Sequence, residues 1–204
     1  MNPANDPNKE PLQYPSSVAQ LVLILGGARS GKSAFAQRLA LQSGKSVAYI
    51  ATATAGDEDM SGRIKQHQAT RPAHWYTVEE PLYLAPALRQ ASVQSDIILL
   101  DCITLWLSNW LFMQGHAPTG YIDSAITEIE AILSVVAELD QHKTLVIVSN
   151  EVGLGIVPAY ASGRVYRDVL GRVNQRLASA ATRVYLMVAG LGVDIKRLHD
   201  ETSL

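Results

Sequence analysis

Cysteine, net charge and long apolar runs are all scarce in this sequence, and each shortage excludes a class of protein. The single cysteine, Cys102, cannot form an intramolecular disulfide, which suits the reducing cytoplasm. The 17 basic and 19 acidic side chains give a net charge of −2, so the chain has no positive surplus for binding nucleic acid. Its apolar runs are shorter than the ~18 residues that a membrane helix needs, so we expect no membrane span.

Residues 1–17 also lack the features that would give them a regular structure. They are rich in Pro and Asn, and they contain neither the apolar core of a signal peptide nor a helical or strand period. We therefore expect a disordered leader and a cytoplasmic protein. The remaining residues, 18–204, belong to a chain with 48% hydrophobic side chains, which is enough for one well-buried domain.

The most informative stretch that is present is a phosphate-binding loop, Gly26-x-x-x-x-Gly31-Lys32-Ser33, between an apolar strand at 20–25 and a helix at 34–42. Its glycines allow backbone N–H groups to converge on phosphate oxygens, and the positive end of the helix faces the anion. Lys32 is predicted to reach the β and γ phosphates, and the Ser33 hydroxyl to ligate Mg²⁺. The predicted phosphate-binding residues are Gly26, Gly27, Ala28, Arg29, Ser30, Gly31, Lys32 and Ser33.

Short apolar runs alternate with longer helical patterns along the rest of the chain. This alternation predicts an α/β fold, a mostly parallel sheet flanked by helices on both faces, with the P-loop NTPase (RecA-like) architecture. Further strands are expected at 46–52, 96–100, 144–149 and 183–188. Helices are expected at 58–69, 81–92, 103–113, 121–140 and 162–180, and a surface loop that is not a domain boundary at 114–120.

An aspartate closes the apolar run Ile97-Ile-Leu-Leu-Asp101. In proteins with a phosphate-binding loop, such a carboxylate helps to hold Mg²⁺, usually through water, because that cation prefers hard oxygen ligands. An aspartate at a strand end can also serve as a cap alone. We favour the metal role for Asp101 because the loop is present.

A basic segment with two histidines extends from Met60 to Trp75. In a helix over 58–69, Arg63 would lie one turn before His67 on the same side. An unprotonated imidazole beside guanidinium groups can attack a phosphate, because the arginines neutralise the anion. An ordinary solvated helix face would show the same pattern, and from the pattern alone this second interpretation is favoured.

Seven blocks of the sequence, taken in order, resemble one family, and this resemblance favours the nucleophilic role of His67 over the solvated helix face. Between residues 20 and 196 the sequence is similar to the bifunctional adenosylcobinamide kinase / adenosylcobinamide-phosphate guanylyltransferase family of cobalamin biosynthesis. The blocks are Leu25-Gly-Gly-Ala-Arg-Ser-Gly-Lys-Ser33, Tyr49-Ile-Ala-Thr52, Arg63-Ile-x-x-His67, Arg71-Pro-x-x-Trp75-x-Thr77-x-Glu79-Glu80-Pro81, Leu100-Asp-Cys-Ile-Thr104, Ser149-Asn-Glu-Val-Gly153-x-Gly-Ile-Val-Pro158 and Gly171-Arg-Val-Asn-Gln-Arg-Leu-Ala178.

The resemblance implies two reactions on one scaffold. The family phosphorylates the aminopropanol hydroxyl of adenosylcobinamide with ATP or GTP. It then transfers GMP from GTP to adenosylcobinamide phosphate through a guanylyl-histidine intermediate, which gives adenosylcobinamide-GDP and pyrophosphate. Mg²⁺ as cofactor, GTP and ATP as substrates, and a homo-oligomer, in this family a trimer, are implied in the same way.

The resemblance also implies which residues act. His67 occupies the guanylylated position, whereas His74 lies beyond Pro72 and is not expected to react. Glu79 is implied as a guanosine contact, since a carboxylate can accept hydrogen bonds from the N1 and N2 donors of guanine. The further nucleotide-binding residues implied are Ala51, Thr52, Ala53, Gln68, Ala69, Thr70 and Arg71.

Two other features have competing interpretations. Glu151, in the glycine-containing segment 150–155, follows an expected strand and either contacts the corrinoid, supports phosphorylation, or lies in a plain loop. Trp106 and Trp110, spaced four residues apart on one expected helix, fit core packing or an oligomer contact better than a corrinoid platform.

Three other functions share parts of the pattern. A small-molecule kinase without nucleotidyl transfer would use the loop and Asp101 but form no adduct on His67. A regulatory GTP-binding protein would need an Asn-Lys-x-Asp motif, which the sequence lacks; Asp168-Val-Leu-Gly171 fits only a looser pattern, inside an expected helix. A recombinase-like ATPase motor would share the fold, but the near-neutral charge and short chain argue against it.

Overall fold

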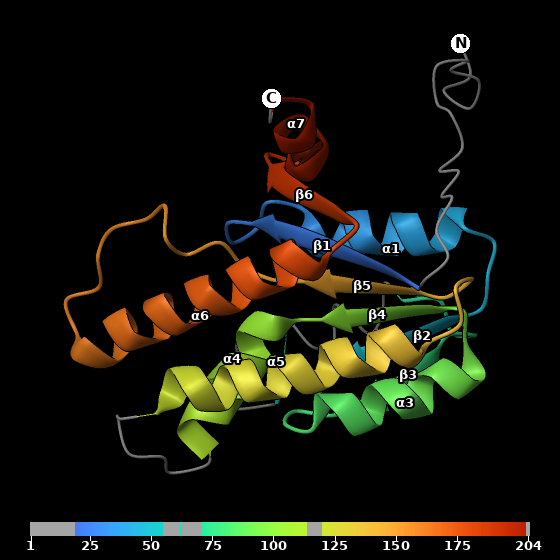
Figure 1. The fold of residues 1–204 in the computed structure, drawn as a ribbon, viewed down its shortest axis with the longest axis horizontal. Helices are drawn as coiled ribbons and strands as arrows, with labels where there is room; N and C mark the ends of the chain where they lie inside the picture. The colour runs from blue at the N-terminus through green and yellow to red at the C-terminus, as the bar shows by residue number, and fades with distance from the viewer. Residues whose placement is uncertain (1–18, 55–61, 63–70, 114–119, 203–204) are drawn as a thin grey trace.

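A seven-stranded sheet forms the centre of the molecule (Figure 1). The computed structural model describes residues 19–54, 62, 71–113 and 120–202. The strands lie in the order β3-β2-β4-β5-β1-β6-β7, and all neighbours are parallel except β6 and β7. The strands are β1 (Gln20–Gly26), β2 (Val47–Ala51), β3 (Tyr76–Glu79), β4 (Ile97–Asp101), β5 (Thr144–Val148), β6 (Arg183–Val188) and β7 (Leu191–Asp194).

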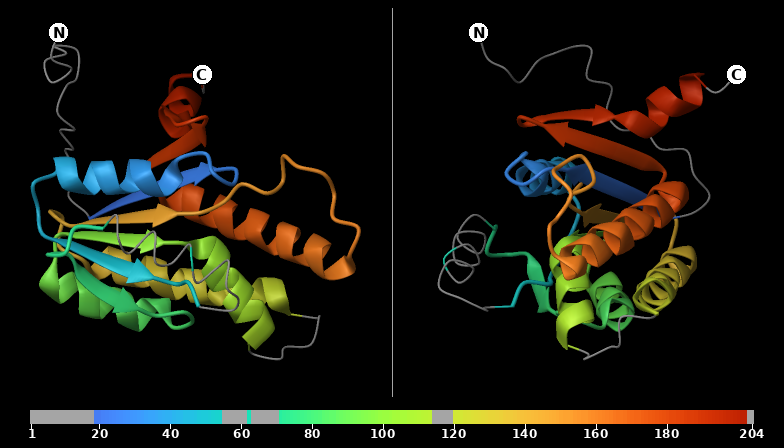
Figure 2. Two further views of the ribbon diagram at one scale, coloured as in Figure 1. Left: turned by 180° about the vertical axis from the view of Figure 1, so that it is seen from behind. Right: turned by 90° about the vertical axis from the view of Figure 1, so that its left-hand side faces the viewer.

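Helices cover both faces of the sheet, as Figures 1 and 2 show. Among the helices that the structure describes, α1 (Lys32–Gln42) covers one face and packs Ala36 and Ala40 against the sheet. The other carries α3 (Leu84–Gln94), α4 (Ile103–Met113), α5 (Tyr121–Glu138) and α6 (Ala161–Ala180). The mostly parallel sheet between two helical layers confirms the predicted fold class.

The central strands are apolar along their whole length because both of their faces are covered. In β4, Ile98 and Leu100 point into the larger core under α3 to α6, and Ile97 and Leu99 point toward α1. These four side chains are all buried. Such continuous apolar runs bounded by polar residues are what made the central strands predictable.

Three short elements are missing from the sequence-based prediction: β3, β7 and α7 (Ile195–Thr202). β3 and β7 have only four residues each and lie at the two edges of the sheet, where exposed positions dilute the apolar signal. α7 buries no residue fully. Its Lys196 reaches the C-terminal carbonyls of α6, donating to Ala178 O at 2.9 Å and Ser179 O at 3.1 Å.

Two predicted helix starts are wrong. α1 begins at Lys32 instead of residue 34, because the last residues of the phosphate-binding loop already have helical geometry after the left-handed Gly31. α3 begins at Leu84 instead of residue 81. The Glu80 carboxylate accepts the N–H groups of Leu82 and Tyr83, at 2.8 and 2.9 Å, so this stretch forms a turn before the helix.

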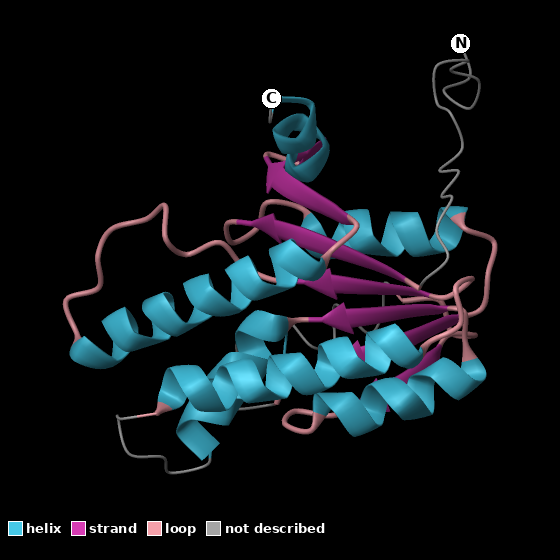
Figure 3. Cartoon of the chain, in the orientation of Figure 1, coloured by secondary structure: helices cyan, strands magenta, loops and turns pink. Residues whose placement is uncertain are grey.

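The other boundaries differ from the prediction by no more than two residues. Figure 3 shows the helices in cyan and the strands in magenta. The leader 1–17, nearly all of the helix predicted at 58–69 and nearly all of the loop predicted at 114–120 lie outside the described residues. Within the described part of the chain, no helix is long and apolar enough to cross a membrane.

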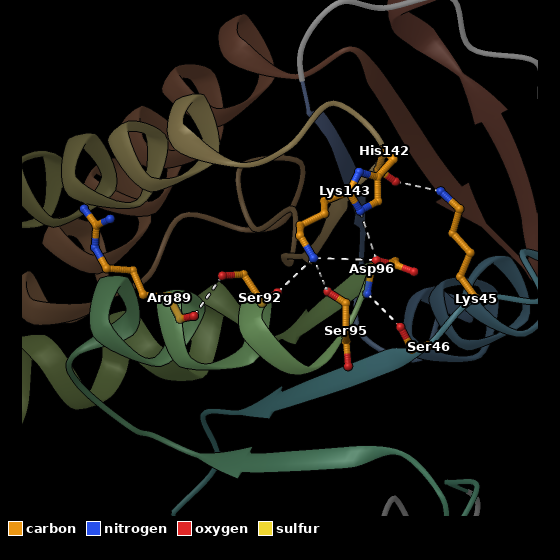
Figure 4. A network of polar contacts seen from close by, with 8 residues as sticks. All are labelled: Lys45, Ser46, Arg89, Ser92, Ser95, Asp96, His142 and Lys143. Atoms are coloured by element: carbon orange, nitrogen blue, oxygen red, sulfur yellow. Dashed lines mark hydrogen bonds and ion pairs between the residues drawn. The ribbon is translucent and has the colours of Figure 1, made fainter.

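A network of polar contacts ties the sheet together at the amino ends of its strands (Figure 4). Asp96, just before β4, lies 3.3 Å from His142 Nε2 and 3.6 Å from Lys143 Nζ, measured from its Oδ1. Lys143 Nζ also donates to Ser92 O and Ser95 O at the end of α3, at 2.9 and 3.1 Å. The network thus joins the starts of β4 and β5 to the end of α3.

Candidate functional site

The carboxyl ends of the parallel strands bring most of the predicted site residues to one edge of the sheet. Ala51, the last residue of β2, pairs in register with Glu79 of β3 and with Asp101 of β4. The phosphate-binding loop leaves the same edge from β1. Parallel sheets covered by helices bind ligands at this edge, so the topology alone assembles residues that are distant in the sequence.

The phosphate-binding loop has a backbone that only glycine allows at its first position. A Cβ on Gly26 would lie 2.5 Å from Met187 O of the neighbouring strand and 2.7 Å from Ser30 Oγ. Gly31 has φ 94° and precedes the first turn of α1, and Arg29 has a positive φ of 58°. The loop is therefore folded into the predicted compact turn at the N-terminus of a helix.

Lys32 lies in the first turn of α1 and is 7% exposed. Its ammonium group donates to Gly27 O at 2.6 Å, across the loop. Burial lowers the pKa of Lys32, and the nearby Cys102 and Asp101 groups oppose that shift. A desolvated ammonium group held inside the loop is suited to binding phosphate oxygens in place of the carbonyl.

The turn between β6 and β7 supports the loop from the other side. Ala189 and Gly190 both have positive φ, 50° and 84°, as a two-residue hairpin turn requires. Gly190 N donates to Ser30 O at 3.0 Å. Ser30 Oγ is buried and has no hydrogen-bond partner among the described residues.

A chain of three side chains lies beside the loop, on the face of the sheet that α1 covers. Tyr49 Oη donates to Asp101 Oδ2 at 3.0 Å. The Arg71 guanidinium lies over the Tyr49 ring, 3.5 Å from its centroid, and donates to Thr77 Oγ1 at 3.1 Å. Burial, reinforced by the charge of Asp101, raises the pKa of Tyr49, so the phenol keeps its proton and remains the donor.

The end of β2 is held by contacts to the chain after β4 and to α4. Thr52 is fully buried, and its Oγ1 donates to Cys102 O at 2.7 Å and accepts from Cys102 N at 2.9 Å. Asn109 of α4 donates to Thr52 O at 2.8 Å. Burial raises the pKa of the Cys102 thiol to about 12. Cys102 packs against the α1-side core, as a structural residue at a strand end would.

The segment after β5 begins at the phosphate-binding loop. Glu151 N donates to Gly26 O at 2.9 Å, and the Glu151 carboxylate accepts from Gly153 N. The buried Asn174 of α6 fixes the start of this segment by donating to Asn150 O at 3.0 Å. Farther along, Leu154 and Ile156 are exposed. The prediction for Glu151 is thus confirmed in position, while its role stays a prediction.

Several predicted site residues can be located and others cannot. Glu79 is exposed at the carboxyl end of β3, and His74 is exposed in the turn before that strand. The predicted nucleophile and its neighbours lie outside the described residues: Arg63, His67, Gln68, Ala69 and Thr70. Of the predicted nucleotide-binding residues 68–71, Arg71 is the one that the structure describes, and its contact with the Tyr49 ring connects it indirectly to Asp101.

The predicted Mg²⁺ ligands are chemically suited to that ion. Ser33 supplies a hydroxyl from the first turn of α1, and Asp101 a carboxylate from the end of β4. Both are hard oxygen donors at the sheet edge that holds the phosphate-binding loop. Asp101 is also close enough to Lys32 to affect its pKa. These observations fit a cation bound next to nucleotide phosphates.

Sequence reasoning missed Tyr49 and Asn109. Tyr49 is 3% exposed within an apolar strand, where its hydroxyl gave no separate signal. Asn109 lies in the apolar sequence of α4, and an amide in such a helix could have indicated a fixed backbone partner.

The two tryptophans of α4 pack against each other with ring centroids 5.7 Å apart. They are nearly or fully buried, which confirms the packing interpretation.

Solved structures show where else this fold occurs. An ATPase from the type III secretion system of pathogenic bacteria superposes with a TM-score of 0.55 at 11% identity, over 90% of this chain and 58% of that one. At so low an identity the similarity shows the fold alone. It agrees with the predicted RecA-like arrangement of a phosphate-binding loop on a parallel sheet.

Sequence comparison is more specific. The chain is 48% identical over 174 residues to the bifunctional adenosylcobalamin biosynthesis protein CobP of Pseudomonas aeruginosa, covering 85% of this chain and 96% of the relative. It is 42% identical over 182 residues to the CobU protein of the same description in Salmonella typhimurium, covering 86% and 99%. A family model described as cobinamide kinase / cobinamide phosphate guanyltransferase matches residues 22–195. The chain therefore belongs to the cobinamide kinase / cobinamide phosphate guanyltransferase family.

Proposed function

We propose that this protein carries out both reactions for which its family is described. It phosphorylates adenosylcobinamide with ATP or GTP, and it then transfers GMP from GTP to adenosylcobinamide phosphate. The observation that carries the proposal is the folded phosphate-binding loop, with Lys32 inside it and Asp101 beside it, in a chain matched to this family over residues 22–195.

In the first reaction the substrate hydroxyl attacks the γ-phosphorus of the nucleotide. The new O–P bond forms as the bond to the β-γ bridging oxygen breaks, and the hydroxyl proton is lost to solvent. The loop amides and the Lys32 ammonium bind the oxygens on which negative charge accumulates. No enzyme nucleophile is needed for this step.

In the second reaction a nitrogen of His67 attacks the α-phosphorus of GTP and pyrophosphate leaves. A phosphate oxygen of adenosylcobinamide phosphate then attacks the same phosphorus, and the His67–P bond breaks to release adenosylcobinamide-GDP. Splitting one transfer into two easier displacements is the usual gain from covalent catalysis. Arg63, and Arg71 at the other end of the segment, supply positive charge for the phosphates.

The remaining roles follow the predicted contacts. Glu79 accepts from the N1 and N2 donors of guanine, and residues 51–53 and 68–71 line the nucleotide site. When Mg²⁺ is bound, it neutralises phosphate charge, and Ser33 and Asp101 would hold it. The exposed Glu79 at the end of β3 is separated from Asp101 at the end of β4 by the intervening strand β2, which fits a nucleotide extended along the sheet edge.

Labelling with α-³²P GTP and Mg²⁺ tests the proposal. We expect the wild type and His74→Ala to form an adduct that mild acid cleaves and base leaves comparatively stable, which is the signature of a phosphoramidate. His67→Ala should lose the label and guanylyl transfer but still phosphorylate adenosylcobinamide. His74 is the matched control because it lies seven residues away in the same basic segment.

Peptide mapping of the labelled protein decides the outcome. Label on a peptide without His67, or undiminished label in His67→Ala, would contradict the two-step transfer. If the wild type phosphorylates adenosylcobinamide but forms no adduct, the protein is a kinase alone.

We also propose that it assembles as a homo-oligomer, a trimer by resemblance to its family, which light scattering during size-exclusion chromatography would test.

A further inference from the structure

We propose that Tyr49 is a positioning residue that holds the metal-binding carboxylate of Asp101 and the phosphate-binding guanidinium of Arg71 in one arrangement. The inference rests on the proposed roles of Asp101 and Arg71, and it adds a third residue that contacts both. Tyr49 itself touches neither the nucleotide nor the metal in this proposal; it acts through its two neighbours.

The position of Tyr49 in the sheet makes the double contact possible. It lies on the central strand of the β3-β2-β4 group, in register with Thr77 on one side and Leu99 on the other. Its side chain points to the α1 face, two residues before β2 ends. Asp101 lies on the same face of β4, since residues alternate between faces along a strand.

The contact with Asp101 fixes the orientation of the carboxylate. Tyr49 Oη donates to Oδ2 at 3.0 Å, and a buried phenol on a strand has little freedom to move. Lys32 is the competing partner, because its ammonium is close enough to interact with the Asp101 charge. The hydrogen bond to Tyr49 therefore holds the carboxylate in one orientation, in which it can serve the metal.

The contact with Arg71 fixes the guanidinium. Its Cζ lies over the Tyr49 ring, 3.5 Å from the centroid, and its Nη1 donates to Thr77 Oγ1 at 3.1 Å. Arg71 Nε is buried and has no hydrogen-bond partner among the described residues. An unpaired buried donor on a positioned cation is what an anionic ligand would satisfy.

Two substitutions separate the two contacts. Tyr49→Phe keeps the ring under Arg71 and removes only the hydroxyl that binds Asp101, whereas Tyr49→Leu removes both contacts. Tyr166→Phe is the matched control, since Tyr166 also has a raised pKa through burial and donates to a backbone carbonyl, Thr104 O, at 2.8 Å. The control loses a similar hydrogen bond but has no contact with Asp101 or Arg71.

The quantity to measure is the affinity for Mn²⁺, which electron paramagnetic resonance monitors directly. The titration is done in the presence of α,β-methylene GTP, which cannot donate GMP. We expect Tyr49→Phe to weaken Mn²⁺ binding by about tenfold or more, as loss of a partner that orients a metal ligand commonly does. Raising Mg²⁺ should restore its turnover. Tyr49→Leu should in addition weaken nucleotide binding by a few-fold when no metal is present. Tyr166→Phe should bind Mn²⁺ and the nucleotide like the wild type.

Asp101→Ala distinguishes failure of this inference from failure of the proposed function. We expect it to weaken Mn²⁺ binding, and Tyr49→Phe to add nothing in the Asp101→Ala background, because the two residues act as one unit. If Asp101→Ala leaves Mn²⁺ affinity unchanged, the metal role of Asp101 is wrong, and this inference with it. If Asp101→Ala weakens binding but Tyr49→Phe does not, with melting temperatures near the wild type, the positioning role of Tyr49 alone is overturned.

Discussion

Two lysines at opposite ends of the sheet make similar contacts in different surroundings. Lys32, at the carboxyl ends of the strands, donates to Gly27 O within the phosphate-binding loop. Lys143, at the amino ends, donates to Ser92 O and Ser95 O and lies 3.6 Å from the Asp96 carboxylate (Figure 4). Both side chains are largely buried. The partners of Lys143 belong to the fold, whereas we propose that Lys32 exchanges its carbonyl partner for the phosphate oxygens of a ligand.

The difference lies in what surrounds each ammonium group. Near Lys143, the stretch from the end of α3 to the start of β4 supplies two carbonyls and a carboxylate, which use its hydrogen-bonding capacity within the protein. Near Lys32, the loop backbone is held in left-handed conformations at Arg29 and Gly31, and Ser30 Oγ is buried without a partner among the described residues. An unpaired buried atom is not in itself the distinction, since Gln20 Oε1 at the amino end of β1 also lacks a partner among the described residues. The distinction lies in the phosphate-binding loop around Lys32 and in the carboxylate partner of Lys143.

The largest effect should come from Lys32→Ala. We expect it to abolish both activities, a loss of at least about a thousandfold, because it removes the charge that neutralises phosphate oxygens. The melting temperature should remain near that of the wild type, because Lys32 contacts the loop and not the core. Turnover of each reaction and a thermal melt of the same purified sample are the measurements. A folded Lys32→Ala with near-normal turnover would contradict the phosphate role.

Asp96, just before β4, and Asp101, the last residue of β4, extend the comparison between the two ends of the sheet. Asp101→Asn should raise the Mg²⁺ concentration needed for half-maximal activity by about ten- to a hundredfold, because an amide is an uncharged and poorer partner for the cation. Asp96→Asn, at the other end of the same strand, is the control and should leave the Mg²⁺ dependence unchanged. Titrating Mg²⁺ against initial rate tests both variants; identical curves would reduce Asp101 to a strand-end cap.

A substitution at the amino ends of the strands should change the stability of the protein and leave its activity unchanged. Lys143→Met leaves Ser92 O and Ser95 O without their donor, and we expect the free energy of unfolding to fall by about 1–3 kcal/mol. The values of kcat and KM should stay those of the wild type. Urea denaturation followed by circular dichroism measures the first quantity, and steady-state kinetics the second. Loss of activity in a fully folded Lys143→Met would show that the two ends are not independent.

The smallest effect should be a change in the preference for GTP over ATP, in the variant Glu79→Gln. Glu79→Gln exchanges a carboxylate that only accepts hydrogen bonds for an amide facing the guanine donors. We expect kcat/KM for GTP to fall by about three- to tenfold more than that for ATP in the phosphorylation step. Glu80→Gln is an informative neighbour, since the Glu80 carboxylate binds the N–H groups of Leu82 and Tyr83. Equal losses with both nucleotides in Glu79→Gln would remove Glu79 from base recognition.

The positions of several elements were predictable because their signals are local. The strands β1, β4, β5 and β6 are uninterrupted apolar runs, and α4 was predicted with its correct bounds. β3, β7 and α7 were not predicted, because each is short and lies at an edge, where neighbours and not its own sequence determine its structure. The starts of α1 and α3 were misplaced for another reason: the loop residues after Gly31 are already helical, and the Glu80 carboxylate stabilises a turn before α3.

By itself, the sequence determined the phosphate-binding loop, the fold class, the family and the candidate residues Lys32, Ser33 and Asp101. Local spacing carries these features, since glycines, an ammonium and a hydroxyl at fixed intervals can form such a loop from neighbouring residues alone. Only the tertiary structure decided that Tyr49 links Asp101 to Arg71, and that Gly190 supports Ser30. These contacts join strands in an order that differs from the order along the chain, because burying both faces of a parallel sheet brings distant residues into register.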